Sequence, residues 1–162
     1  MELPRGFRRL GGVRPGRSSF PAGGSDTMTR SARRVVLVDD CDDLRLIVRV
    51  LLTRAGYEVV AEARDGMAGV LAAGSSAPDV VLLDLDMPVL DGWGALPLLR
   101  TAAPHARIVV FSHDVTLASL ERLHSLGAHG AVRKGSRLRD VLAAVDSALF
   151  EQRGDRFLEK VE

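Results

Sequence analysis

The chain has 162 residues, of which 46% are hydrophobic and 27% are charged, a composition typical of a globular protein with one sizeable core. Its net charge is +1, but residues 1–30 contain six arginines and two acidic residues, so residues 31–162 contain 16 basic and 19 acidic groups. A mildly acidic main body gives no electrostatic case for binding nucleic acid.

Cysteine content and hydropathy narrow the class further. Cys41 is the only cysteine, so an internal disulfide is excluded and a reducing cytoplasm is the simplest location. The two aspartates before it oppose formation of a thiolate, so we expect Cys41 to be unreactive. No apolar run approaches the 18 or so residues that a membrane-spanning helix needs. We therefore predict a cytoplasmic protein without a membrane segment.

The chain divides into three parts. Residues 1–32 are rich in Gly, Pro, Ser and Arg without periodicity, which predicts a disordered basic tail. Met28 is an alternative start of the chain, and a basic arm that contacts an acidic partner is another interpretation of the tail. Residues 33–150 carry regular apolar patterning. Residues 151–162 are a mostly charged extension that can lengthen the last helix, so we expect no DNA-binding or catalytic output domain on this chain.

The apolar pattern predicts alternating strands and helices. The first run, 35–38, ends at Asp39 and Asp40. A stripe with helical spacing follows and ends at Gly56; we expect its inward face to consist of Leu44, Ile47, Val48, Leu51, Leu52 and Ala55. Further strands are predicted at 57–61, 80–83, 107–111 and 131–133, and further helices at 67–73, 93–99, 115–126 and 138–149. This order predicts an α/β fold, in which a doubly wound, five-stranded parallel sheet lies between two layers of helices.

Polar residues stand where four of these strands end: Asp39 and Asp40, Asp84, Ser112 and Lys134. Taken singly, each is most often a turn former, a helix cap or a solvated charge. The carboxyl ends of parallel strands share one edge of the sheet, so together they predict a site. Clustered carboxylates favour Mg²⁺, which would allow Asp84 to attack a phosphoryl group while Lys134 and Ser112 stabilise the phosphoryl oxygens.

At these positions the sequence resembles the receiver domains of two-component response regulators, and the resemblance spans 33–150. It rests first on the acidic pair after the first strand, Asp39–Asp40, and on the loop after the third strand, 84–92, with its Met-Pro and Asp-Gly pairs. It also rests on the family's Ser/Thr and Lys positions, Ser112 and Lys134, and on the Gly-Ala pair before the last strand, Gly127–Ala128.

The resemblance implies a flavodoxin-like fold and a role in phosphorelay signalling, in which Asp84 accepts a phosphoryl group from a sensor histidine kinase or phosphotransfer protein. It implies that Asp40, Asp84 and the main-chain carbonyl of Asp86 bind Mg²⁺, with Asp39 acting partly through water. A stand-alone receiver of this kind would signal through contact with a downstream protein target and would not turn over an external substrate.

Three positions depart from the family pattern. Ala131 stands where the family typically has a Tyr or Phe that rotates inward when Ser112 moves, and His113 stands where a small residue is frequent, which would narrow access to Asp84. Gly135 follows Lys134 where the family often has a proline, so no cis peptide is expected there. The resemblance places the contact surface on the face built from the fourth helix, the fifth strand and the fifth helix, around 115–126 and 136–149.

Two other functions fit part of the pattern. The alanine at 131 also suits a pseudo-receiver, an interaction module that does not use phosphate. Asp84-Leu85-Asp86 matches the Asp-x-Asp motif of haloacid-dehalogenase-type phosphohydrolases, but that family has this motif at its first strand and its acidic pair last, the reverse of the order here.

Overall fold

A computed structural model describes residues 31–150 and the main chain of 159–160, so the predicted tail at 1–32 lies outside the described residues except for its last two positions. The strands are β1 (Arg34–Val38), β2 (Glu58–Ala63), β3 (Val80–Leu83), β4 (Arg107–Ser112), β5 (Gly130–Arg133) and β6 (Glu159–Lys160). The helices are α1 (Asp42–Arg54), α2 (Gly66–Ser76), α3 (Gly92–Ala102), α4 (Leu117–Ser125) and α5 (Leu138–Phe150).

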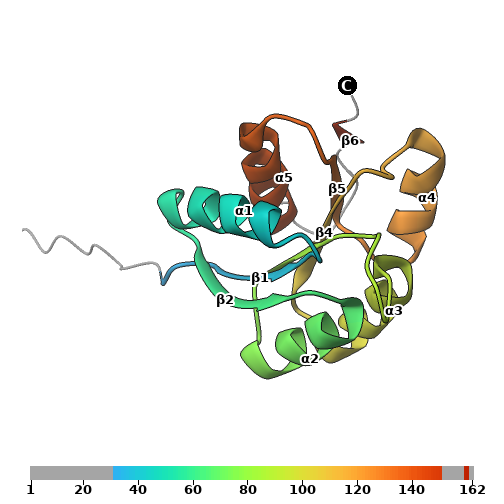
Figure 1. Ribbon diagram of the computed structural model, residues 1–162, viewed down its shortest axis with the longest axis horizontal. Coiled ribbons are helices and arrows are strands. Elements are labelled where there is room, and N and C mark those ends of the chain that lie inside the picture. Colours follow the sequence, from blue (N-terminus) through green and yellow to red (C-terminus); the bar gives the residue numbers. More distant parts are fainter. Residues whose placement is uncertain (1–30, 151–158, 161–162) are drawn as a thin grey trace, which may run out of the picture. The chain divides into compact units, whose positions relative to one another are not determined.

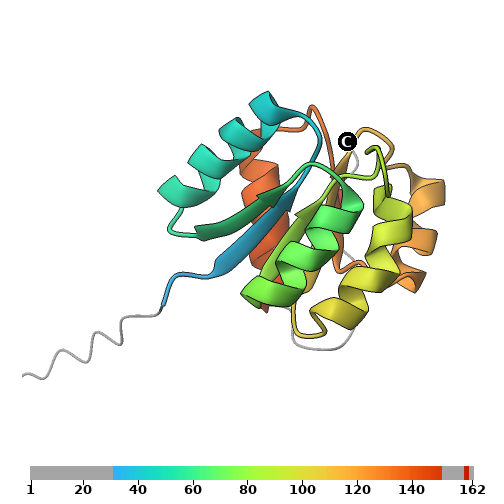
Figure 2. The same ribbon diagram turned by 60° about the horizontal axis from the view of Figure 1, so that its bottom comes forward.

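The strands form one parallel sheet in the order β2-β1-β3-β4-β5-β6. Helices α1 and α5 cover one face, and α2, α3 and α4 cover the other (Figure 1). A view from below shows α2 and α3 side by side against the sheet (Figure 2). The predicted doubly wound α/β fold with five parallel strands is therefore confirmed, and β6 adds a short sixth strand at the β5 edge.

The central strands explain why the sheet is covered on both faces. All four residues of β3 are buried, and they alternate between two apolar cores. Val81 and Leu83 pack with α2, α3 and α4, whereas Val80 and Leu82 pack with α1 and α5. A continuous apolar strand of this kind is stable only between two layers of helices, and this arrangement leaves the carboxyl ends of the strands as the place where polar side chains gather.

The face of helix α1 that packs against the sheet differs from the predicted one. Val48 and Leu52 are buried as expected, but Ile47 is 47% exposed and Ala55 is exposed, so their predicted inward position was wrong. The buried face instead includes Arg45. The apolar pattern was ambiguous because Leu46, Ile47 and Val50 extend it around the helix. A pattern of apolar residues also leaves out every arginine, including one whose side chain is buried.

The C-terminal extension is described only at residues 159–160. Helix α5 ends at Phe150, and residues 159–160 form a strand instead of more helix; residues 151–158 lie outside the described residues. Strand β6 pairs with β5, with Ala131 opposite Glu159 and Val132 opposite Lys160. The pairing covers the edge of β5, a strand that the resemblance includes in the contact surface. Within the described residues, no helix has both the length and the apolar character that crossing a membrane requires.

The loop between β3 and α3 contains a strained residue. Val89 has a φ of 68°, and the main-chain N–H of Leu90 donates to the carbonyl of Pro88 at 2.8 Å. This is a three-residue γ-turn, whose form with positive φ is rare and strained. A β-branched residue is especially disfavoured there. The Val89 side chain is 85% exposed, so packing offsets little of this strain.

We expect Val89→Gly to raise the free energy of unfolding by about 1 kcal/mol, because glycine adopts a positive φ without the clash of a Cβ. Urea unfolding monitored by circular dichroism measures the change. The matched control is Val89→Ile, which keeps the β-branch and should leave stability unchanged. Equal stability of the Gly and Ile variants would contradict the assignment of strain to Val89.

His129 joins β4 to the segment before β5 through its imidazole ring. The ring Nδ1 accepts the main-chain N–H of Ile108 at 3.0 Å, and the main-chain N–H of His129 donates to the Ile108 carbonyl at 2.7 Å. Burial, together with the positive charges of Arg107 and Arg100, lowers the pKa of His129 to about 4. A protonated ring could no longer accept this hydrogen bond, so the fold requires neutral His129.

The unfolded chain binds a proton on His129 below about pH 6.5, whereas the folded chain does so only near pH 4. This contribution to stability is therefore complete above pH 6.5 and is lost as the pH falls toward 4. We expect His129→Asn to flatten the fall of unfolding free energy across this interval, by at most about 1.4 kcal/mol per pH unit. Urea unfolding of wild type and His129→Asn at pH values from 4.5 to 8 tests this. Plotted against pH, the unfolding free energies of the two proteins should run parallel above pH 7 and diverge below it, and parallel plots throughout would exclude the effect.

Candidate functional site

Asp39 and Asp84 lie next to each other at the carboxyl ends of β1 and β3. The last paired residues of these strands are Val38 and Leu83, and the aspartates follow them directly. The main-chain N–H of Asp84 donates to the carbonyl of Val38 at 2.8 Å, which continues the ladder by one step. The strand order reverses between β1 and β3, and open parallel sheets bind ligands at such a point.

Lys134 connects the two carboxylates, although its strand, β5, is separated from β3 by β4. It follows β5, and its Nζ lies 2.7 Å from Oδ2 of Asp39 and 2.7 Å from Oδ2 of Asp84. All three side chains are buried, with at most 9% of each exposed. A buried charge is tolerated only when it is paired. Lys134 therefore satisfies both acids at once, and it needs both of them.

Two groups in this cluster, the Asp39 carboxyl and the Lys134 ammonium, have shifted pKa values. Burial raises the pKa of the Asp39 carboxyl, and the hydrogen bonds from Lys134 and from the Cys41 N–H oppose this only in part. Burial by itself would lower the pKa of Lys134, but its hydrogen bonds to Asp39 and Asp84 outweigh this effect and raise it. The ammonium group is therefore firmly charged, whereas burial makes ionisation of the Asp39 carboxyl harder than in water.

Asp40 completes an acidic group of three. Carboxylate oxygens of Asp39, Asp40 and Asp84 lie within 4.8 Å of one another, and Asp40 is exposed to solvent. With Lys134 included, the ionised cluster carries a net charge of about −2. Oxygen ligands, an unbalanced double negative charge and one exposed carboxylate suit a hard divalent cation such as Mg²⁺. The residues present therefore fit the metal that the sequence predicted.

The loop after β3 holds the other Asp84 oxygen. Oδ1 accepts the main-chain N–H of Leu85 at 2.7 Å and that of Asp86 at 3.4 Å. The chain then turns back, and Gly92 lies so close that a Cβ there would be 2.1 Å from the main-chain oxygen of Asp84. The Asp-Gly pair of the sequence motif thus has a steric reason, because only glycine allows α3 to begin against the back of Asp84.

Ser112 ends β4, the strand between β3 and β5. Its side chain is fully buried, its Oγ accepts the Asp114 N–H at 3.4 Å, and its carbonyl accepts the Lys134 N–H at 2.9 Å. The main-chain bond ties the ends of β4 and β5 together behind the lysine. A polar pocket opens beside them, lined by His113, Arg133, Lys134, Gly135 and Ser136.

Most of the residues predicted for the site thus come together. Side-chain contacts join Asp39, Asp84 and Lys134, Asp40 lies within metal-sharing distance, and Asp86 contributes its N–H to the turn. Ser112 lies on the adjacent strand end. Sequence reasoning missed one residue at this edge, Arg45, whose guanidinium donates to the main-chain carbonyl of Asp39. Its spacing of three and seven from Val48 and Leu52 was the available signal.

Ala131 is buried in β5 with 1% exposure and belongs to the core beneath α2, α3 and α4. It is three residues from Lys134, and Val110 of β4 pairs with it. A methyl group at this place fills core volume but has no ring to rotate. Any change at Ser112 must therefore reach the surface by way of other side chains.

The comparisons with known proteins agree with this geometry. The model of the response regulator receiver domain family matches residues 35–146. The chemotaxis protein CheY of Bacillus subtilis is 31% identical over 118 residues, which cover 73% of this chain and 98% of that protein. A LuxR-family two-component response regulator from Aurantimonas sp. SI85-9A1 has a TM-score of 0.69 at 33% identity, with 74% of this chain and 86% of that chain covered.

Other relatives are longer. The transcription regulator BvgA of Bordetella pertussis is 31% identical over 116 residues, which cover 72% of this chain but 56% of BvgA, so the chain spans about half the length of the first curated relatives that it matches. The family-model match at 35–146 includes Asp39, Asp40 and Asp84. The chain belongs to the response regulator receiver domain family, whose members act in two-component phosphorelay signalling.

Proposed function

We propose that Asp84 is the phosphoacceptor of this receiver and that it takes its phosphoryl group from a phosphohistidine on a sensor histidine kinase or phosphotransfer protein. One observation carries the proposal: Lys134 Nζ bridges Asp84 and Asp39 at 2.7 Å each, beside Asp40. A structural ion pair would need one acid for one lysine. Three acids around one lysine make a site that is short of positive charge, which suits a phosphoryl group that arrives with a cation.

The chain's own residues account for the transfer. An Asp84 carboxylate oxygen forms a bond to phosphorus, and the bond from phosphorus to the imidazole nitrogen of the donor breaks, with its electron pair remaining on that nitrogen. Main-chain N–H groups of Leu85 and Asp86 hold Asp84 in place. Lys134 would then pair with a phosphoryl oxygen of the acyl phosphate, and Ser112 would donate a hydrogen bond to another.

Asp40, Asp84 and the main-chain carbonyl of Asp86 would hold Mg²⁺, with Asp39 acting partly through water. When bound, the cation screens the carboxylates from the oxygens of the incoming phosphoryl group. The exposed position of Asp40 gives the ion a route from solvent. Burial, with a smaller contribution from the nearby Asp84 carboxylate, raises the pKa of Asp39, and a bound cation would favour its ionised form.

The proposed output is contact with a downstream protein in the cytoplasm, without turnover of an external substrate. This proposal follows from the receiver fold, whose helices and strands make up the described residues 31–150. Ala131 lends weight to one alternative, a pseudo-receiver that binds its partner without phosphate, because it is buried where an aromatic switch would stand. Phosphate uptake separates the two functions.

We expect Asp84→Asn to abolish phosphorylation by acetyl phosphate in the presence of Mg²⁺, because the amide is not a nucleophile and adds no negative charge to the site. Intact-protein mass spectrometry detects one base-labile phosphoryl group on the wild-type chain. The control is Asp79→Asn, at the amino end of the same strand, where the aspartate accepts the Arg34 N–H at 2.8 Å; it should be labelled like wild type. Labelling of the Asp84→Asn variant would move the acceptor elsewhere, and an unlabelled wild type with intact fold would favour the pseudo-receiver.

A further inference from the structure

A second group of charges lies at the same edge of the sheet and is joined to the acidic cluster through the main chain of Asp39. At its centre is Arg45, which is 7% exposed and is the one buried arginine among the residues that the structure describes. A buried guanidinium must be fully paired, and losing its partners costs several kcal/mol. The hydrogen bonds of Arg45 therefore show which parts of the chain this side chain holds together.

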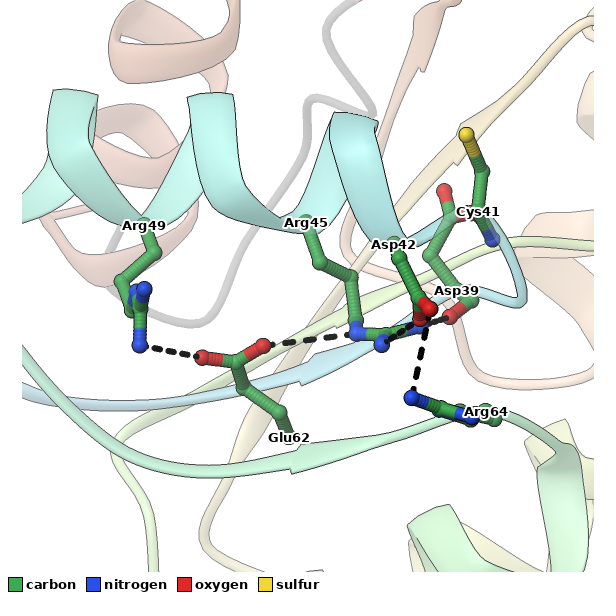
Figure 3. Close-up of polar contacts among 7 residues, drawn as sticks. All are labelled: Asp39, Cys41, Asp42, Arg45, Arg49, Glu62 and Arg64. Atoms are coloured by element: carbon green, nitrogen blue, oxygen red, sulfur yellow. Dashed lines mark hydrogen bonds and ion pairs between the residues drawn. The ribbon is translucent and has the colours of Figure 1, made fainter.

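The Arg45 guanidinium donates to three separate acceptors (Figure 3). Nη1 donates to the main-chain carbonyl of Asp39, Nη2 to a carboxylate oxygen of Asp42, and Nε to Oε2 of Glu62 at 3.3 Å. These acceptors belong to the end of β1, the first turn of α1 and β2. The planar fork of an arginine suits three acceptors spread over three elements in a way that the point charge of a lysine does not.

Two outer arginines complete the network. Arg49 pairs with the other oxygen of Glu62 at 3.3 Å, and Arg64 pairs with the other oxygen of Asp42 at 3.2 Å. Their side chains are 49% and 72% exposed, and exposed ion pairs contribute little to stability. Within residues 31–150, their ion pairs are with Glu62 and Asp42 and not with the acidic cluster. Arg45 is thus the member of the network that reaches the predicted metal ligands.

The contact with Asp39 is made to its carbonyl, which leaves the carboxylate oxygens for other partners. Oδ1 accepts the Cys41 N–H at 2.8 Å and Oδ2 accepts Lys134. The carbonyl of Asp39 shares a rigid peptide plane with the N–H of Asp40. Fixing this carbonyl therefore fixes the direction in which the chain enters Asp40, whose exposed side chain has few neighbours to orient it.

We propose that Arg45 is a positioning residue for the divalent-metal site: by holding the Asp39 carbonyl, it sets the peptide plane from which the Asp40 carboxylate projects. The inference rests on the proposed function, because it assumes that the acidic cluster binds the metal. Arg45 itself contacts neither the metal nor the phosphoryl group. Its effect should therefore appear in metal affinity and not in the rate at saturating metal.

Arg45→Met tests this, because the thioether side chain fills similar space without donating hydrogen bonds. Residues that orient metal ligands typically affect affinity by about 10- to 100-fold. We expect Arg45→Met to raise the Mn²⁺ concentration for half-saturation about tenfold, measured by electron paramagnetic resonance without any phosphodonor. Arg49→Met removes a neighbouring ion pair of Glu62 but leaves the Asp39 carbonyl bonded, so it should bind Mn²⁺ like wild type.

The Mg²⁺ dependence of labelling by acetyl phosphate supplies the second measurement. Half-maximal labelling should shift to about tenfold higher Mg²⁺ in Arg45→Met, while the maximal rate changes less than about twofold. A folded Arg45→Met variant with wild-type half-saturation overturns the proposal. So does a maximal rate that falls without a shift, since that is the result expected of general loss of packing.

A further variant covers the case in which Arg45→Met does not fold. Arg45→Lys keeps the buried charge but cannot serve three acceptors, so we expect a shift of about threefold in Mn²⁺ half-saturation, and an unshifted value again overturns the proposal. Failure of the proposed function is distinguishable: a wild type that binds Mn²⁺ but is never labelled contradicts the phosphoacceptor assignment while the Arg45 comparison still stands.

Discussion

The structure depends on one electrostatic constraint, which is that three carboxylates are held at one edge of a sheet with a single ammonium group between two of them. Lys134 lies 2.7 Å from both Asp39 and Asp84, and these residues come from the last, first and third strands of the predicted sheet. The pairing can therefore form only when the strand order is complete. Its incomplete neutralisation is also the property that a cation and a phosphoryl group can use, so the same interaction links the fold to signalling.

The positions of the site residues followed from the sequence because they are set by strand ends. A parallel strand buried on both faces is a continuous apolar run, so the first polar residue after it marks its carboxyl end with little ambiguity. This identified Asp39, Asp84 and Ser112. Lys134 follows Arg133, a polar residue that still belongs to β5, so its place came from the predicted strand at 131–133 and from the resemblance. The structure brings Asp39, Asp84 and Lys134 into contact. The contact distances were not predictable, because they depend on the register between strands that are distant in the chain.

The residues that the sequence misplaced are those whose environment comes from other elements. Ile47 was predicted to face the sheet and is 47% exposed, whereas Arg45 is buried. Helical periodicity records apolar character alone, and Arg45 is buried only because β1 and β2 bring a carbonyl and a carboxylate to its guanidinium. Strand β6 is a similar case: its two residues carry no strand pattern of their own, and the exposed edge of β5 determines where they pair.

The two buried cationic side chains at this edge of the sheet, Lys134 and Arg45, bind different atoms of Asp39. Lys134 contacts carboxylate oxygens and so moderates the repulsion between Asp39 and Asp84, whereas Arg45 contacts the Asp39 carbonyl and neutralises neither. Had the arginine paired with the carboxylates, the cluster would have lost the excess negative charge that suits a divalent ion. Binding the main chain holds the loop in place and keeps that charge. A cation that holds the main chain of the loop and leaves its carboxylates unneutralised thus fixes Asp39 without using up the charge that a divalent ion would bind.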